Sequence, residues 1–396
     1  MQLNSDQSMD HLGHELKDLP KNLVCFSHLR WDFVFQRPQH LLTRLAKAMK
    51  VFYVEEPVVI ASEKLPHYLL QQRSEITLII PQLPAGLNPA ESVSVQEQLL
   101  DDFMIEHQIT NYAFWYYTPM ALEFSRKYKP ELTVFDCMDE LSAFKFAPES
   151  LKTLEKELLK KADVVFTGGH SLYEAKKDKH TNIYAFPSSI DKSHFAKARM
   201  LKKTAENQDA AYRPKLGFYG VIDERFDAEL IKGIADARPD WDLMLLGPVV
   251  KIDPQTLPQK DNIYYIGTKS YAELPDLMAA WDIALIPFLL NESTRFISPT
   301  KTPEYLAAGL PVISTAIRDV VNPYGELGLV SIGDTPAEFV MLSEKELDRK
   351  DKKEWQQKVD LFLSNISWDI TCAQMVSVMS TALNPAPVFH NTLVQS

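Results

Sequence analysis

The stretch from Asn291 to Thr315 reads Asn-Glu-Ser-Thr-Arg-Phe-Ile-Ser-Pro-Thr-Lys-Thr-Pro-Glu-Tyr-Leu-Ala-Ala-Gly-Leu-Pro-Val-Ile-Ser-Thr. It follows an apolar run, residues 282–288, that we predict as a buried strand. A helix is expected to begin near Thr300 and to end at Gly309, because glycine is favoured just past a helix end. Residues 311–315 read as the next strand. This order of strand, loop, helix and strand predicts an α/β fold.

The start of this helix is a candidate anion site. Pro303 suits a first helical turn, and a helix that starts at the carboxyl end of a strand presents unpaired N–H groups and the positive end of a dipole. Lys301 and Arg295 add two formal charges. The candidate capping residues are Ser298, Thr300 and Thr302.

Glu304 is the unusual member of this stretch, since a carboxylate repels a bare phosphate. It can, however, accept hydrogen bonds from vicinal hydroxyls such as those of a ribose. Phosphate donors followed by a hydroxyl acceptor fit a nucleoside diphosphate. The alternative is that Glu304 only complements the helix dipole and that Lys301 is solvated.

Composition places the chain among ordinary globular proteins. Its 396 residues are 45% hydrophobic and 24% charged, with three cysteines far apart in sequence. The cysteine pattern favours a reducing compartment and offers neither a disulfide framework nor a zinc ligand spacing. The net charge of -11 argues against general binding to nucleic acid. No signal-peptide core or membrane-spanning run is visible, so we expect a cytoplasmic protein, with peripheral contact at the inner face of the membrane left open.

The order of expected elements predicts two similar domains. Strands alternate with amphipathic helices from residue 22 onward and again from residue 215, which favours two parallel sheets covered by helices on both faces. We predict an acceptor-side Rossmann-like domain (1–195), a charged linker (196–213), a donor-binding Rossmann-like domain (214–370), and a final helix with a disordered tail (371–396). Two such domains imply a cleft between them.

Two loops at predicted strand ends carry further candidate residues. After the strand from Lys215, Gly220 permits close backbone approach and Arg225 can hold phosphate oxygens, although a local ion pair with Glu224 or Asp227 is the alternative. After the first strand comes a polar loop that suits ligand binding, with packing under the loop as the alternative. Its candidate residues are Trp31, Asp32, Gln36, Arg37, Gln39 and His40.

Other motifs are weaker. Asp139 and Glu140 end a strand of the first domain, where they suit either an acceptor hydroxyl or a turn. The Asp240-Trp-Asp242 spacing lies at the wrong edge of its strand for a metal site, and a lone His170 is more often structural. No nucleophile elbow, P-loop or zinc-protease motif occurs in the sequence.

Taken together, residues 298–312 resemble the donor-site signature of glycosyltransferase family 4 and its relatives with the GT-B fold. Residues 31–39, 136–139 and 217–225 are similar to a subgroup of bacterial enzymes that build surface polysaccharides such as teichuronic acid, and the resemblance runs in order from about residue 23 to 369. It implies a GT-B fold and a retaining, metal-independent transfer of a sugar from a nucleotide-diphosphate sugar to a glycan or lipid-linked acceptor, with no other cofactor.

The resemblance also implies roles for single residues. Arg225 and Lys301 would hold the diphosphate and act in catalysis with Asp139, and Glu304 would hold the ribose. The loop with Trp31, Asp32, Gln36, Arg37 and Gln39 would meet the acceptor. The remaining donor-binding candidates are Gly220, Ser298, Thr300 and Thr302, with the backbone of Ile266, Gly267 and Thr268 at the base.

Two departures from the family pattern keep an alternative open. The first glutamate of the family's pair would fall at position 296, which is Phe296 here, and it is not evident whether Glu292 replaces it. Relatives often carry a histidine after the strand that ends at Asp136, where this chain has Cys137. A catalytically impaired nucleotide-sugar-binding protein that assists assembly is therefore the second hypothesis. A sugar-nucleotide epimerase is a weaker third.

Overall fold

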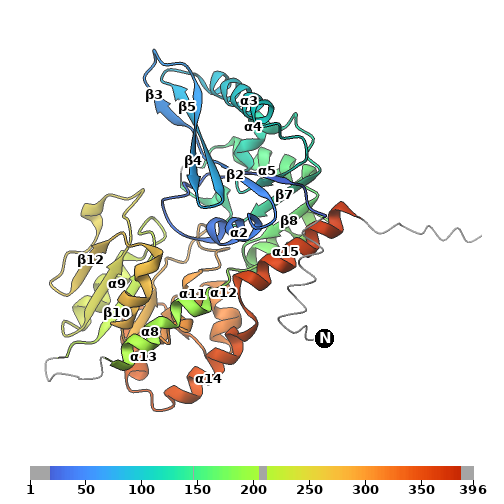
Figure 1. Ribbon diagram of the computed structural model, residues 1–396. Helices are drawn as coiled ribbons and strands as arrows, with labels where there is room; N and C mark the ends of the chain where they lie inside the picture. The colour runs from blue at the N-terminus through green and yellow to red at the C-terminus, as the bar shows by residue number, and fades with distance from the viewer. Residues whose placement is uncertain (1–17, 146, 205–211, 385–396) are drawn as a thin grey trace, which may run out of the picture.

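The computed structural model describes residues 18–145, 147–204 and 212–384, which form two lobes built on separate sheets (Figure 1). The first sheet has the order β3-β5-β2-β1-β6-β7-β8-β9, and all these pairs are parallel. An antiparallel strand, β4, pairs with β5. Its strands are β1 (Asn22–Phe26), β2 (Lys50–Val54), β3 (Val58–Ile60), β4 (His67–Arg73), β5 (Ile76–Pro84), β6 (Tyr112–Tyr116), β7 (Leu132–Cys137), β8 (Val164–Thr167) and β9 (Ile183–Ala185).

The second sheet is parallel and has the order β12-β11-β10-β13-β14-β15. Its strands are β10 (Lys215–Tyr219), β11 (Asp242–Leu246), β12 (Ile263–Gly267), β13 (Ile283–Ile286), β14 (Val312–Ser314) and β15 (Ser331–Ile332). In both sheets the first strand lies in the interior and the order reverses beside it. Ligands bind at this kind of reversal in open α/β sheets, outside the carboxyl ends of the strands.

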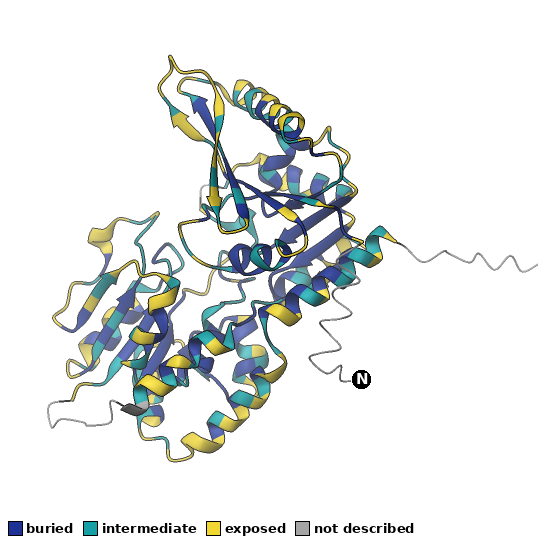
Figure 2. Ribbon diagram, viewed as in Figure 1, coloured by how far each residue is buried: buried dark blue, intermediate teal, exposed yellow. Residues whose placement is uncertain are grey.

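Helices cover the sheets and bury most of their strands, whereas β3 and β4 are largely exposed (Figure 2). Those of the first half are α2 (Arg37–Leu45), α3 (Pro89–Glu106), η1 (Pro119–Ala121), α4 (Leu122–Ser125), η2 (Leu141–Ala143), α5 (Ser150–Lys161), α6 (His170–Lys176) and η3 (Lys177–Lys179). Those of the second half are α7 (Lys192–Phe195), α8 (Lys197–Thr204), α9 (Ala228–Ala237), η4 (Pro254–Thr256), η5 (Tyr271–Glu273), α10 (Leu274–Ala279), α11 (Lys301–Ala307), α12 (Arg318–Val320), η6 (Val321–Gly325), α13 (Pro336–Leu347), α14 (Lys352–Phe362), η7 (Leu363–Asn365) and α15 (Trp368–Leu383).

The chain crosses between the two lobes twice. After β9 it enters the second core with Ile190 and Phe195, and after α14 it returns to the first core with Trp368 and the apolar face of α15. The crossings meet where the Trp368 backbone N–H donates to the Ile190 carbonyl oxygen at 3.3 Å. Each core is therefore completed by a segment next to a crossing, and α15 lies along the first lobe (Figure 1).

The predicted linker differs from the structure. Residues 197–204 form helix α8, which packs on the second lobe through buried Ala198. Arg199 donates to Asp360 at 2.8 Å and Lys202 to the Trp281 carbonyl oxygen at 2.6 Å. The high charge of this segment hid an amphipathic helix, because long cationic side chains reach over the neighbouring surface. Residues 205–211, the leader before residue 18 and the predicted tail from residue 385 lie outside the described part.

The strands β3 and β4, which both pair with β5, were also missed in the sequence, because largely exposed strands lack an apolar pattern. Between β6 and β7 the helical residues are limited to η1 and α4. Within the described ranges, none of the helices has the length and apolarity needed to span a bilayer.

We predict that the Trp368→Ala variant loses about 3–5 kcal/mol of unfolding free energy, because the indole is buried and stacks on His40 with ring centroids 4.7 Å apart. Ile370, on the same helix and 40% exposed, provides the matched control. Its change to alanine is expected to cost under about 1 kcal/mol. Urea unfolding followed by circular dichroism measures both. Equal losses would show that α15 is not part of the first core.

Candidate active site

A cleft between the two lobes contains two adjoining cavities. The large cavity is about 870 Å³ and the small cavity about 170 Å³. Most walls of the large cavity come from the first lobe, whereas the small cavity is bounded mainly by the second. The two cavities share Val34, Gln36, Met138, Asp139, Val221 and Arg225. One ligand can therefore extend from one lobe to the other.

Lys301 opens helix α11 and lines the small cavity. Thr300 occupies the N-cap position but gives no side-chain cap. Gly220, at the end of β10, has φ +142, and a Cβ there would lie 2.2 Å from Lys301 Cε and 2.7 Å from Nζ. Glycine is favoured at position 220 because residues with a Cβ rarely adopt φ +142, and a Cβ there would also displace the end of the Lys301 side chain.

The Lys301 ammonium has no hydrogen bond or ion pair with any of the described residues. Its Nζ lies 5.6 Å from the ring centroid of Phe288 and 5.8 Å from those of Phe218 and Tyr219. Burial and the nearby Arg225 charge lower the pKa of Lys301 to about 8. This is the electrostatic environment of a cation that gains stability when an anion binds beside it.

Arg225 lines both cavities and is held by Asp223. Its Nε donates to Asp223 at 3.0 Å and its Nη2 donates to Asp223 at 2.6 Å. A local ion pair therefore forms, but its partner is Asp223 and not the predicted Glu224 or Asp227. The guanidinium also lies 5.3 Å from the ring centroid of Phe144, a residue of the first lobe. Burial acts to lower the pKa of Arg225, but the hydrogen bonds to Asp223 outweigh it and raise the pKa. Arg225 thus stays charged and oriented toward the cleft.

Glu304 lies one turn into α11, 5% exposed, on the wall of the small cavity. It accepts a hydrogen bond from the Tyr219 hydroxyl, and burial raises the pKa of Glu304 well above its ordinary value. A carboxyl group with one such partner retains acceptor capacity for a second hydroxyl.

Asp139 follows β7 and stands where the two cavities meet. Burial raises the pKa of Asp139, and the Arg225 charge across the cleft opposes that rise. Within the described residues its carboxylate accepts no protein hydrogen bond. A carboxylate of one lobe therefore faces the cations of the other.

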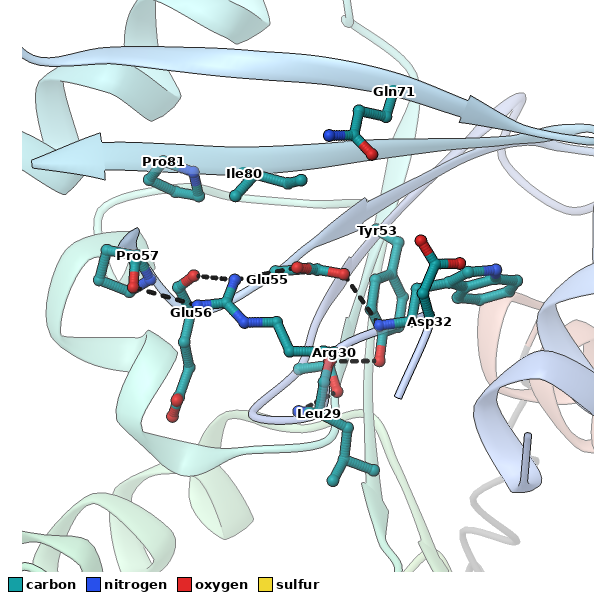
Figure 3. A network of polar contacts seen from close by, with 12 residues as sticks. Leu29, Arg30, Asp32, Tyr53, Glu55, Glu56, Pro57, Gln71, Ile80 and Pro81 are labelled. Carbon is teal, nitrogen blue, oxygen red and sulfur yellow. Dashed lines mark hydrogen bonds and ion pairs between the residues drawn. The ribbon is translucent and has the colours of Figure 1, made fainter. Parts of the chain in front are cut away.

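The loop after β1 is fixed by a network around Glu55 (Figure 3). Glu55 accepts from Arg30 Nη1 at 2.9 Å and from the Trp31 backbone N–H at 2.8 Å. Arg30 also donates to the carbonyl oxygens of Glu56 and Pro57. Some of the polar residues of the loop therefore serve to hold its conformation and are not free to bind a ligand.

Arg37 is buried, contrary to the expectation that it contacts an acceptor. Its Nε and Nη2 both lie 2.9 Å from Asp136 oxygens, and its Nη1 donates to the Phe186 carbonyl oxygen at 2.7 Å. Each of the three guanidinium nitrogens of Arg37 thus donates a hydrogen bond to a protein oxygen. Arg37 borders the small cavity. Its hydrogen bonds hold Asp136 of β7, which lies three residues before Asp139 in the sequence.

Three other candidates of this loop line neither cavity. Trp31 is buried edge-on to Tyr53, and Gln39 donates to the Trp31 carbonyl oxygen at 2.7 Å. Asp32 pairs with Arg73 on β4 at 2.8 Å, away from the cleft. Of the predicted acceptor residues, Gln36 remains, on the wall of both cavities.

The donor-side candidates divide in the same way. Ser298 and Thr300 line the small cavity with Gly220. Thr302 is fully buried and its hydroxyl has no partner in the described residues, so it neither caps the helix nor faces the cavity. Ile266, Gly267 and Thr268 end β12 outside both cavities, with Gly267 at φ +75.

The departures from the family pattern can now be placed. Phe296 packs against the apolar cluster of the first lobe. Glu292 is 76% exposed and pairs with Arg295 at 3.5 Å, so it does not replace the missing glutamate, and Arg295 adds no charge to the cavity. Asp240 and Asp242 pair with Arg238 and Arg213. No metal-binding group of three His, Cys, Asp or Glu exists among the described residues.

Sequence reasoning missed Tyr219, Asp223, Ser188 and Phe144. Tyr219 and Asp223 flank Gly220 in the exit loop of β10, where the glycine is the signal that could have drawn attention to them. Ser188 and Phe144 reach the cleft through tertiary contacts, and no local pattern marks them.

Comparison with known proteins agrees with this geometry. Residues 213–344 match the family described as glycosyl transferases group 1. The matched residues all lie in the second lobe. A Bacillus subtilis (strain 168) protein with the provisional name of teichuronic acid biosynthesis glycosyltransferase TuaH is 23% identical over 268 residues, which cover 61% of this chain and 65% of the relative.

Solved structures identify the fold of the whole chain. Sucrose-phosphate synthase from Thermosynechococcus elongatus superposes with a TM-score of 0.66 at 14% identity, covering 90% of this chain and 98% of that one. A structure described as trehalose-6-phosphate from E. coli bound with UDP-2-fluoro glucose gives 0.65 at 13% identity, covering 91% and 99%. The GT-B fold expected from the sequence is confirmed by these structures. The matched family and the Bacillus subtilis relative agree with the expected resemblance.

We predict that Arg37→Ala unfolds the protein more easily by about 3–5 kcal/mol, because it leaves Asp136 charged and unpaired in the core. Asp32→Ala, at an exposed pair on the same loop, is expected to leave the unfolding midpoint unchanged. Urea unfolding of the two variants measures the difference. A stable Arg37→Ala variant with only weakened acceptor binding would restore the original assignment.

Proposed function

We propose that this chain is a glycosyltransferase that moves a sugar from a nucleotide-diphosphate sugar to a glycan or lipid-linked acceptor in bacterial surface polysaccharide synthesis. The observation that carries the proposal is the partly buried, unpaired Lys301 ammonium beside Arg225, facing Asp139 across one continuous cleft. The family of residues 213–344 and the surface-polysaccharide relative support the same reaction class.

The proposed role of each residue follows from where negative charge develops during sugar transfer. When the sugar leaves its diphosphate, negative charge grows on the phosphate oxygens, and fixed cations at that point supply a large catalytic contribution. Arg225 and Lys301 fill this role, and Glu304 accepts a hydrogen bond from the ribose. We propose a retaining transfer without a metal ion or other cofactor, because two cations neutralise the leaving group. Asp139 then meets the acceptor hydroxyl from the opposite wall.

The large cavity is the acceptor side of this proposal. Its walls mix apolar side chains such as Phe33 and Met120 with charged ones such as Arg30 and Lys251. A glycan with an apolar carrier fits that mixture, and Gln36 is the one predicted acceptor residue that remains on its wall.

A second candidate, a nucleotide-sugar-binding protein without turnover, is favoured by Phe296. This side chain takes the place of the family's first glutamate and packs into the first lobe. The donor cations are kept in that case, while a sugar contact is lost.

A panel of UDP-, GDP-, ADP- and dTDP-sugars separates the two functions. We expect release of nucleoside diphosphate that depends on an oligosaccharide or lipid-linked acceptor, and loss of at least about 100-fold in Glu304→Ala and Arg225→Ala. Donor affinity without release in the wild-type protein supports the binding function. Absence of both binding and release contradicts each of them.

The depressed pKa of Lys301 gives a pH test. The ammonium is charged below its pKa of about 8 and neutral above it. We therefore expect the affinity for nucleoside diphosphate, measured by calorimetry, to fall as pH rises from 7 to 9. In Lys301→Arg the charge persists, since guanidinium does not titrate in this range. A wild-type affinity that is constant across these pH values would separate Lys301 from the phosphate.

A further inference from the structure

We propose that Asp319 and Lys176 are positioning residues that act through helix α6 to hold the Asp139 segment against the donor side of the cleft. The inference rests on the proposed function, and it assigns a role to the Gly168-Gly-His-Ser171 motif. Gly168 borders the small cavity, and the other three residues line neither cavity. Neither Asp319 nor Lys176 is placed in contact with substrate.

The first link joins the two lobes. Asp319, on α12 of the second lobe, accepts a hydrogen bond at 3.0 Å from the backbone N–H of Ser171 in α6 of the first. Both residues are buried, at 5% and 1% exposure. Helix α6 has no side-chain cap of its own, because Gly169 holds the N-cap position. The second lobe therefore supplies the cap that the first lobe lacks.

Gly168 and Gly169 allow the start of α6 to approach its neighbours closely, because neither residue has a side chain. A Cβ at Gly169 would lie 2.3 Å from Asp319 Oδ2 and 2.9 Å from Ser298 Cβ. A Cβ at Gly168 would lie 2.4 Å from the Met138 carbonyl oxygen. The segment before α6 is thus packed between the second lobe on one side and the residue preceding Asp139 on the other.

The far end of α6 holds the same segment by charge. Lys176, fully buried in the last turn, pairs with Glu140 at 2.8 Å and with Glu155 of α5. Glu140 is the neighbour of Asp139 in sequence. Because Lys176 is buried, helix α6 fixes the position of its ammonium group, and the ion pair then fixes the position of the Glu140 carboxylate.

These contacts form one path from the second lobe to Asp139. Asp319 holds the start of α6, Gly168 touches Met138, and Lys176 holds Glu140. A shift of α6 is passed to the residues on both sides of Asp139. The cations and the carboxylate that face each other across the cleft are therefore aligned by the fold and not only by a bound substrate.

The test compares kcat with nucleotide binding. In Asp319→Ala we expect kcat to fall roughly 10- to 100-fold, as for misplaced reacting groups. Affinity for the best nucleoside diphosphate should stay within about twofold, since Arg225 and Lys301 are untouched. Asp319→Asn retains an oxygen acceptor for the Ser171 N–H and should recover most of the loss. Lys176→Met should show the same pattern as Asp319→Ala.

Two matched controls lose similar contacts away from the cleft. Asn88→Ala removes the cap of α3, in which Asn88 Oδ1 accepts from the Glu91 N–H at 3.0 Å. The bond from the Ser171 N–H to Asp319 has the same length. Lys127→Met removes a lysine that also pairs with two carboxylates, Glu97 and Asp101. Neither is expected to change kcat.

Hydrogen exchange of residues 138–145 supplies a readout that is independent of turnover. Faster exchange there in Asp319→Ala and Lys176→Met, but not in the controls, supports the proposal even if no donor is turned over, an outcome that would count against the proposed function alone. Unchanged exchange and kcat in folded Asp319→Ala protein, with retained nucleotide affinity as the check on folding, would overturn it.

Discussion

The site depends on one electrostatic constraint, a partly buried ammonium without a counter-ion. Removing the Lys301 charge from water is unfavourable, which its lowered pKa expresses, and among the described residues no carboxylate pairs with it. Gly220 leaves room for its stem, and Gly247 is constrained in turn, since a Cβ there would lie 1.9 Å from the Gly220 carbonyl oxygen. The ends of β10 and β11 are thus shaped around a cation whose natural partner is a ligand.

The second constraint is that the proposed chemistry takes groups from both lobes. Asp139 belongs to the first sheet and Lys301 to the second, so their alignment depends on how the lobes are joined. Two kinds of contact join the lobes. The two crossing segments are linked by the hydrogen bond from the Trp368 N–H to the Ile190 carbonyl oxygen, and Asp319 of the second lobe accepts from the Ser171 N–H of the first. Short-range contacts at several points fix an orientation better than one flexible linker does.

Much of the fold could be read from the sequence because it rests on local periodicity. The parallel strands are apolar runs bounded by turns, and Gly309 ends α11 at φ +77 as expected. Helix α8 was hidden by its charges, whose aliphatic stems cover apolar surface. The β3 and β4 strands were missed because both faces of that extension are exposed, which removes the alternation that identifies a strand.

The site was predictable only where a residue's surroundings are local. Gly220, Arg225, Lys301 and Glu304 meet because they end adjacent strands of one sheet, and that adjacency follows from the α/β pattern. Part of the loop after β1 could not be predicted, because several of its polar residues find partners within the protein. Arg37 binds Asp136 ninety-nine residues away, and no spacing in the sequence reveals that partner, whereas Gln36 borders both cavities. A polar loop at a strand end therefore signals either a ligand or a buried network.

Phe296 shows how the two constraints compete. The family pattern places a carboxylate at this point to meet the ligand, but here the side chain joins the apolar cluster of the first lobe while Arg295 lies over its ring at 5.2 Å. An aromatic residue in that place adds a contact between the lobes. The same loop carries Ser298, whose carbonyl oxygen accepts from Ser188 of the crossing segment at 3.1 Å. The loop that leads into α11 thus holds the two lobes together beside the proposed donor site, and under the proposed function the sugar would be recognised by other residues of the cleft.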